Sequence, residues 1–302
     1  MSKVAKDKEQ KRLEILKTYK IYIGGKFPRT ESGRYYCPLD SKGNKLGNIC
    51  LSSRKDFRNA VVAARSASGD WSTRTAFNRS QVLYRIGEML EGRRSQFIDE
   101  LKKQGLTNAK AETEVNISID RLIYYAGWCD KYQQIFSAVN PVSSSFYNFS
   151  VCEPMGVVAI IAPEENSLIG LISVIAPVIA GGNTCIVLAS ESKPLCAVTF
   201  AEVINSSDVP GGVINILTGN AKELSGHFSS HMDVNAIVST RDDKGELKNI
   251  QINAAENMKR VISWDNNWLS VKAQDPYKIR ALQEVKTTWH PIERIGGAGS
   301  GY

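Results

Sequence analysis

Cysteine is the first residue type in this sequence that could do chemistry, because a thiolate is both a nucleophile and a soft metal ligand. The chain of 302 residues contains six cysteines, namely Cys37, Cys50, Cys129, Cys152, Cys185 and Cys196. No two of them form a CxxC pair, and nothing in the sequence links any of them to a base. We therefore predict reduced, mostly buried thiols in a cytoplasmic protein, with no disulfide framework.

Histidine offers a second kind of chemistry, the binding of zinc. His227 and His231 are four residues apart, a spacing that can place two imidazoles on one helix face. The only other histidine is His290, and no nearby pair of acids completes a ligand set. We interpret these histidines as polar loop residues and predict no metal site.

The elements that must position these residues follow an α/β pattern from about residue 146 onward. Short apolar runs rich in β-branched residues lie at 157–161, 185–188, 213–217 and 236–238, with predicted helices between them. This alternation indicates a parallel sheet covered on both faces, and right-handed crossovers make it a Rossmann-like layer. Helical spacing of apolar residues predicts earlier helices over 56–67, 80–101 and 117–136.

Composition and charge exclude several classes of protein. Hydrophobic residues make up 42% and charged residues 23% of the chain, so a disordered or fibrous protein is excluded. Seven basic and three acidic side chains lie in residues 1–20, which hold +4 of the net charge of +7, so a nucleic-acid-binding face is not required. The uncharged stretch 168–189 is broken by Pro177 and by a Gly-Gly-Asn turn, which predicts a buried helix and strand and no membrane span.

Several motifs resemble the aldehyde dehydrogenase superfamily. Residues 22–26 and 60–72 are similar to the start of the family's chain, and residues 153–163 to its first nucleotide-binding strand. Gly182-Asn183-Thr184 and the run 210–219 match in both order and spacing, so that the resemblance covers residues 21 to about 262. It implies the family's NAD-binding α/β domain, preceded by a helical N-terminal region.

The positions that would carry the family's catalytic residues hold other residue types. Glu165 stands where the family has an asparagine that donates to the developing oxyanion, and an ionised carboxylate cannot donate a hydrogen bond. Trp264 stands at the place of the general-base glutamate and cannot accept a proton, while the neighbouring Asp265 is offset. No cysteine after Cys196 corresponds to the family's nucleophile. The resemblance thus implies no catalytic residue in this chain.

The cofactor-binding positions are also altered. Glu191 matches the glutamate that accepts a hydrogen bond from a cofactor ribose, but Leu188 replaces the lysine beside it. Where the family's phosphate-facing helix begins, this chain has Arg241-Asp242-Asp243, and carboxylates there oppose an anion. Asp243 and Glu246 resemble a capping box that would satisfy the helix N–H groups internally. We therefore expect no bound cofactor and at most residual NAD binding through Glu191.

The largest departure is the loss of a domain. Beyond Trp268 the family has a complete catalytic domain, whereas residues 277–289 here resemble its extreme C-terminal strand. In the family, that strand joins an oligomerisation flap whose start matches residues 146–152. The interface residues that we predict in the flap are Phe146, Phe149, Val285, Thr287 and Trp289. Of these, Val285, Thr287 and Trp289 should share one face of a strand that is covered by another subunit or by residues 146–152.

Three functions follow from these observations. The first is a pseudoenzyme similar to the inactive second half of tandem aldehyde dehydrogenases, which assembles with an active aldehyde dehydrogenase-like subunit or with itself. The second is an NAD-binding oxidoreductase subunit with residual or regulatory nucleotide binding. The third is a scaffold that uses residues 1–20 on RNA, a membrane or an acidic partner, and the low charge elsewhere favours it least.

The sequence also predicts a division into domains. Residues 1–20 form a basic N-terminal extension, residues 21–140 and 156–270 the cofactor-type α/β domain, residues 141–155 and 277–293 the flap, and residues 294–302 a flexible glycine-rich tail.

Overall fold

Short β-branched runs form a five-stranded sheet at the centre of the computed structural model, which describes residues 15–143, 145–265 and 267–292. The strands are β6 (Val157–Ile161), β7 (Thr184–Leu188), β8 (Ile214–Leu217), β9 (Ala236–Ser239) and β10 (Arg260–Ser263), in the order β10-β9-β6-β7-β8. All four pairings are parallel, which confirms the predicted fold class. The strand β10 was not predicted, because as an edge strand it is only partly buried and its sequence lacks a long apolar run.

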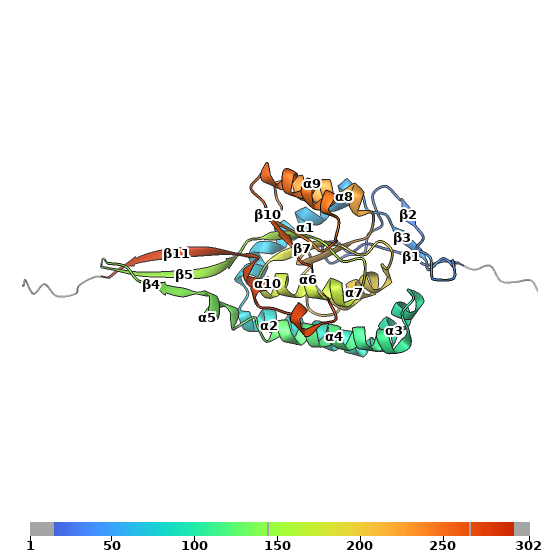
Figure 1. Cartoon of the computed structure of the whole chain (residues 1–302), viewed down its shortest axis with the longest axis horizontal. Coiled ribbons are helices and arrows are strands. Elements are labelled where there is room, and N and C mark those ends of the chain that lie inside the picture. Colours follow the sequence, from blue (N-terminus) through green and yellow to red (C-terminus); the bar gives the residue numbers. More distant parts are fainter. Residues whose placement is uncertain (1–14, 144, 266, 293–302) are drawn as a thin grey trace, which may run out of the picture.

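Helices cover both faces of this sheet (Figure 1). On one face lie α6 (Ile169–Ala180) and α7 (Leu195–Asn205), and on the other lie α1 (Arg54–Thr73), α8 (Ala221–Ser230) and α9 (Lys244–Ala255). An outer layer of α2 (Ala76–Gly92), α3 (Arg94–Lys103) and α4 (Asn108–Ala126) packs against α6 and α7. Every residue of α6 is buried as a result, because the sheet covers one side and α4 the other.

Two of the predicted N-terminal helices are each divided in the structure. The helix predicted over 80–101 breaks at Arg93, where φ is −109° and ψ is 16°, so α2 and α3 are separate. The helix predicted over 117–136 ends at Ala126, and after a turn the short α5 (Tyr132–Phe136) follows. A small sheet of β1 (Thr18–Tyr19), β3 (Asn48–Cys50) and β2 (Tyr35–Tyr36) lies next to the body.

The flap is a three-stranded antiparallel sheet that projects from one end of the body (Figure 1). Its central strand is β5 (Phe146–Pro154), between β4 (Ala138–Asn140) and β11 (Gln283–Pro291). The prediction that the C-terminal strand begins near residue 277 is wrong, because Asp275 and Pro276 start a short helix, α10 (Tyr277–Arg280). Ile279 of that helix is fully buried in the core, so this part of the chain belongs to the body.

Residues 264, 265 and 267–282 lie between β10 and the flap and pass across α4 and α6, where two buried cations hold them. The guanidinium of Arg121 donates to Ser173 Oγ at 2.6 Å and to the carbonyl oxygens of Trp268 and Ser270, each at 3.2 Å. The ammonium of Lys278 lies 5.1 and 4.9 Å from the ring centres of Trp264 and Trp268. Polar and cation–π contacts therefore fix a segment that has little regular structure.

No described helix has the length and hydropathy needed to cross a membrane. All six cysteines are unpaired, and five of them are buried. The glycine-rich tail and most of the basic N-terminal extension lie outside the described residues.

Candidate functional site

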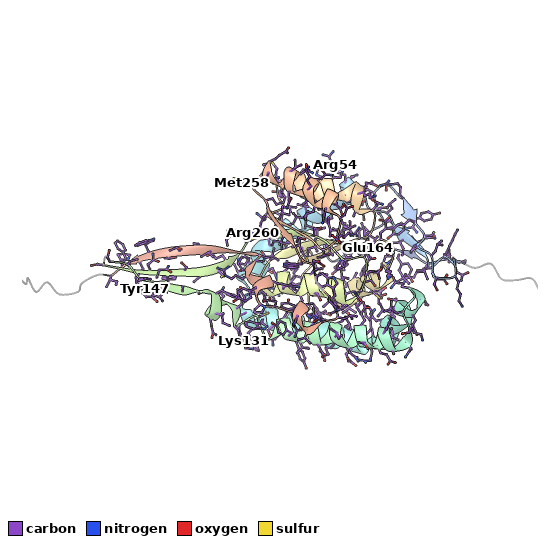
Figure 2. All side chains as sticks on the ribbon, in the orientation of Figure 1. Arg54, Lys131, Tyr147, Glu164, Met258 and Arg260 are labelled. Atoms are coloured by element: carbon purple, nitrogen blue, oxygen red, sulfur yellow. The ribbon has the colours of Figure 1, made fainter. Side chains whose placement is uncertain are left out.

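The carboxyl edge of the parallel sheet is the first candidate site, since such sheets bind ligands where their strands end. The loops after β6, β7 and β9 meet at this edge. At their meeting point lies Glu164 (labelled in Figure 2), a residue that the sequence analysis did not single out.

The carboxylate of Glu164 takes up most hydrogen-bond donors of this edge. It accepts from Ser190 Oγ at 2.8 Å, from Ser192 Oγ at 3.0 Å, and from the backbone N–H groups of Glu191 and Ser192 at 3.1 and 3.2 Å. Arg241 Nη2 lies 2.6 Å from its Oε1. Burial opposes ionisation, but Arg241 and the hydrogen bonds outweigh it and lower the pKa of Glu164 below its ordinary value.

Glu191, the predicted residual cofactor contact, lies at the same edge. Its Oε1 accepts a hydrogen bond from Asn220 Nδ2 at 3.1 Å. The hydroxyl of Tyr36 is buried close by and has no hydrogen-bond partner among the described residues. Burial and the charges of Glu191 and Glu164 raise the pKa of Tyr36 far above its ordinary value. The surroundings of Glu191 are thus rich in negative charge.

The residues at this edge do not fit a dinucleotide cofactor. The N–H groups of Glu191 and Ser192 and the guanidinium of Arg241 could bind an anion, but the carboxylate of Glu164 already occupies them. Arg241 also donates to the carbonyl of Ala162 at 3.1 Å, so its side chain lies across the end of β6. Leu188 is fully buried in the sheet and offers no polar group.

The start of α9, where the family's phosphate-facing helix begins, is capped by the protein itself. Asp243 Oδ1 accepts from the N–H of Glu246 at 2.9 Å, while Asp242 is exposed to solvent. The predicted capping box is only half formed, because Glu246 Oε1 is buried without a partner instead of returning to Asp243. One of the free helix N–H groups is therefore satisfied internally.

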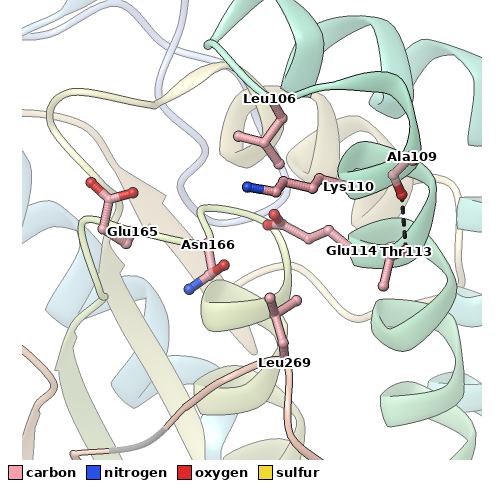
Figure 3. A pocket seen from close by; sticks show the side chains of 8 residues that line it. All are labelled: Leu106, Ala109, Lys110, Thr113, Glu114, Glu165, Asn166 and Leu269. Atoms are coloured by element: carbon pink, nitrogen blue, oxygen red, sulfur yellow. Dashed lines mark hydrogen bonds between the residues drawn. The ribbon is translucent and has the colours of Figure 1, made fainter.

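A cavity of 410 Å³ lies beside the position of the family's oxyanion donor (Figure 3). Glu165 lines it and forms an ion pair with Lys193. Lys110 and Glu114 from α4 point into the same space, and Leu269 closes one side (Figure 3). Glu114 is already engaged, since its Oε1 accepts from the N–H groups at the start of α6. No cysteine is among the described lining residues, so the cavity contains no thiol nucleophile.

Trp264 stands at the position of the family's general-base glutamate, and Asp265 is its neighbour in the chain. Trp264 is buried and packs on the Lys278 ammonium, whereas Asp265 is exposed. His227 and His231 lie at the end of α8. In the part of the chain that the structure describes, no group of three or more metal-ligand side chains comes together.

The flap is the second candidate site, and its register places the predicted interface residues on two faces. Val285, Thr287 and Trp289 lie opposite Cys152, Ser150 and Asn148, so the three share one face as predicted. The ring of Phe146 is on that face as well, 5.9 Å from the Trp289 ring. Phe149 lies on the opposite face, next to Tyr147, with ring centres 5.5 Å apart.

One edge of β11 is covered and the other has no partner among the described residues. Nine residue pairs join β11 to β5, which is one of the two coverings that we predicted for this strand. On the face that they share, Val285 is 54% and Trp289 56% exposed, and Phe146 beside them is 40% exposed. The opposite face holds a shallow apolar groove of 320 Å³ lined by Val139, Tyr147 and Phe149 among others.

Sequence reasoning missed two charged side chains, Glu164 at the carboxyl edge of the sheet and Arg121, which fixes the segment after β10. Glu164 lies three residues after the end of β6 at Ile161, and an acid just beyond a strand end of a parallel sheet is a usable signal. Arg121 interrupts the apolar face of its helix, which predicts a buried cation with several acceptors.

Comparisons with known proteins agree with this architecture. The aldehyde dehydrogenase family matches residues 28–263. The chain is 31% identical over 258 residues to the putative aldehyde dehydrogenase DhaS of Bacillus subtilis (strain 168), covering 83% of this chain and 51% of that protein. It is 30% identical over 264 residues to the cytosolic 10-formyltetrahydrofolate dehydrogenase of Mus musculus, covering 84% of this chain and 29% of that protein.

Solved structures give the same result. An NAD+ complex of an aldehyde dehydrogenase from Bacillus cereus superposes with a TM-score of 0.78 at 25% identity, covering 82% of this chain and 50% of that one. The HpcC protein of Thermus thermophilus superposes with the same TM-score at 26% identity, covering 83% and 48%. The chain thus spans about half the length, or less, of the proteins that it matches.

Proposed function

Because the chain belongs to the aldehyde dehydrogenase family, we propose that it is a catalytically inactive, cytoplasmic subunit that assembles through its flap with an active aldehyde dehydrogenase-like subunit. A second copy of this chain is the other partner with a matching flap. The observation that carries the proposal is the projecting three-stranded flap, in which the outer edge of β11 has no partner among the described residues and aromatic side chains are exposed.

The geometry of the flap supports strand addition. The outer edge of β11 offers backbone N–H and C=O groups, and backbone pairing to such an edge provides affinity without specific side chains. Trp289 and Phe146, in edge-to-face contact, form an aromatic pair beside that edge that can anchor a partner. A monomer would leave both features in water.

The state of the former catalytic positions supports inactivity. Glu165 is held by Lys193, and Trp264 is buried against Lys278. Residues 267–282 lead to the flap and are fixed by Arg121, so that they cover the faces of α4 and α6. Oxidation of an aldehyde through a covalent intermediate would need a nucleophile and an oxyanion donor for the adduct and a base for its hydrolysis, which these positions do not supply.

The alternative function, NAD binding, is less well supported. Glu191 is retained at the right edge of the sheet, but Glu164 occupies the adjoining anion-binding groups. A dinucleotide would have to displace a carboxylate that is already paired with Arg241.

Native mass spectrometry of the untagged protein from its source tests the proposal. We expect a defined complex in which this chain and an active aldehyde dehydrogenase subunit occur in a fixed ratio. The recombinant chain alone should oxidise no aldehyde with NAD. A monomer in the source extract would overturn the assembly role, and NAD-dependent turnover that is lost on replacing one of its own cysteines would overturn the inactivity.

A further inference from the structure

A small basic pocket lies between the first turns of α1 and the last turns of α8. It is lined by Arg54, Phe57, Arg58, His227, Ser230 and His231. Arg54 and Glu164 are well separated in the body (Figure 2), so this pocket is distinct from the carboxyl edge. Its volume is 170 Å³.

The charge of this pocket is not neutralised by the protein. No described carboxylate forms a salt bridge with Arg54 or Arg58, although seven other described arginines have such a partner. Lys259 adds a third cation near His231, and Asp233 is the acid that acts on that ring among the residues described. The concave surface therefore has an excess of positive charge.

The floor of the pocket is rigid and has few acceptors that would repel an anion. Phe57 is buried and stacks on Phe228 with ring centres 4.2 Å apart, and its ring meets His231 edge-on at 5.7 Å. His231 Nδ1 accepts from the N–H of Asp233, which leaves Nε2 as the donor of the neutral ring. The carbonyl oxygens of Ser230 and His231, at the end of α8, are covered by Asn257 and Lys259.

Size and charge together define the ligand class. Sites for organic cofactors enclose about 300–1,000 Å³, so a pocket of 170 Å³ is too small for a nucleotide. Guanidinium groups present parallel N–H donors that match the oxygens of phosphate. We propose that this pocket binds a tetrahedral oxyanion of the phosphate class, either inorganic phosphate or the phosphoryl group of a small ester.

Binding should strengthen as the solution becomes more acidic. Burial lowers the pKa of His231, and so do the nearby cations Lys259, Arg58 and Arg54, against the opposing effect of Asp233. The ring is therefore neutral at pH 7 and gains a proton only as the pH falls through this lowered value, which adds a cation to the pocket. Phosphate itself gains a proton over the same range, whereas sulfate does not, so sulfate isolates the contribution of the protein.

Isothermal titration calorimetry of the full chain with inorganic phosphate tests the proposal, with chloride used to hold the ionic strength constant. We expect saturable binding of one anion per chain. The double variant Arg54→Gln, Arg58→Gln should weaken it by about tenfold or more, because two charge-assisted hydrogen-bonding groups are lost. The control is Lys222→Gln, which removes one exposed positive charge from α8 outside the pocket and should leave binding unchanged.

Two further arms complete the experiment. Glycerol 3-phosphate that binds more tightly than inorganic phosphate would identify an ester as the ligand, and the reverse order would identify the free anion. In the wild-type chain the affinity for sulfate should rise as the pH is lowered from 7 through the lowered pKa of His231, and His231→Gln should remove this rise. Circular dichroism confirms that each variant is folded, and Arg58→Lys provides a milder second variant. The absence of saturable binding, or equal affinity in wild type and double variant, would overturn the proposal.

Discussion

Replacing Glu164 by glutamine should loosen the carboxyl edge of the sheet while the fold persists. Glutamine keeps the length of the side chain and one acceptor oxygen, but it removes the charge that pairs with Arg241. The side chain of Arg241 is only 12% exposed, so its guanidinium would lose its carboxylate in a place where water replaces it poorly.

The size of the effect follows from the contacts of Glu164. A hydrogen bond to a charged group contributes about 1.5–3 kcal/mol, whereas an exposed ion pair contributes about 1 kcal/mol or less. The Glu164 side chain is 34% exposed, and glutamine can still accept some of the hydrogen bonds. We therefore expect a loss of about 2 kcal/mol in the free energy of unfolding, equivalent to about 3 °C in Tm for a chain of this length.

The pH dependence of this loss has a definite sign. The pKa of Glu164 is lowered in the folded protein, so its stabilisation is fully present above the ordinary carboxyl value of 4.5 and is lost as the pH falls through the lowered value. The difference between wild type and Glu164→Gln should therefore be constant from neutral pH to about pH 5 and shrink in more acidic solution.

Urea unfolding of both proteins at a series of pH values measures this difference. The matched control is Glu165→Gln, because Glu165 is the next residue, is 75% exposed and has a single ion pair with Lys193. It should change stability by less than about 0.5 kcal/mol. Equal stability of wild type and Glu164→Gln at pH 7, or a difference that persists unchanged at pH 3, would refute the role assigned to the Glu164–Arg241 pair.

Three other predictions concern assembly, cofactor binding and the segment after β10. Trp289→Ala should weaken subunit association by about 2 kcal/mol or more in analytical ultracentrifugation, whereas Thr288→Ala, on the opposite face, should not; equal losses would argue against an aromatic anchor. Calorimetry with NAD should show no affinity tighter than about 10 μM, roughly −6.8 kcal/mol, and tighter binding would restore the nucleotide-binding function. Arg121→Lys should destabilise the chain by about 3 kcal/mol in urea unfolding, because a lysine cannot reach all four acceptors; an unchanged midpoint would contradict this.

The structure also affects how assembly is best tested by truncation. Ending the chain at Asp275 removes Ile279 and Leu282, both fully buried, and the contact from Gln283 Nε2 to the carbonyl of Gly181. Such a truncation should therefore destabilise the α/β body as well as the flap. Ending the chain after Glu284 removes the flap strand alone and keeps the buried side chains.

The sheet could be predicted from the sequence because its central strands are fully buried. Strands such as β6 and β7 consist almost entirely of apolar and β-branched residues. This composition can be recognised in the sequence without knowing which strands lie beside them. The edge strand β10 lacks that signal, since half-buried positions tolerate the polar Arg260 and Ser263. Its place in the sheet depends on pairing with β9, which is a tertiary contact.

The candidate sites were predictable only in part. The alternation of Val285, Thr287 and Trp289 follows directly from strand geometry, so their common face could be stated in advance. The position of Phe149 on the other face depends on the register between two strands that lie far apart in the chain. The role of Glu164 depends on Arg241, which is 77 residues away and reaches it only through the order of the strands.

During synthesis of the chain, β5 is made well before β11, the strand with which it pairs. The pairing begins at Pro154 and Gln283, so the ribosome must add 128 more residues after β5 before the first residue of its partner strand exists. At synthesis rates of roughly 5–20 residues per second, this delay is on the order of ten seconds. Throughout that interval one edge of β5 stays open in each nascent chain. Until β11 is made, that edge can pair only with a strand from another chain, so the time needed to complete β11 sets how long the flap is open to such pairing.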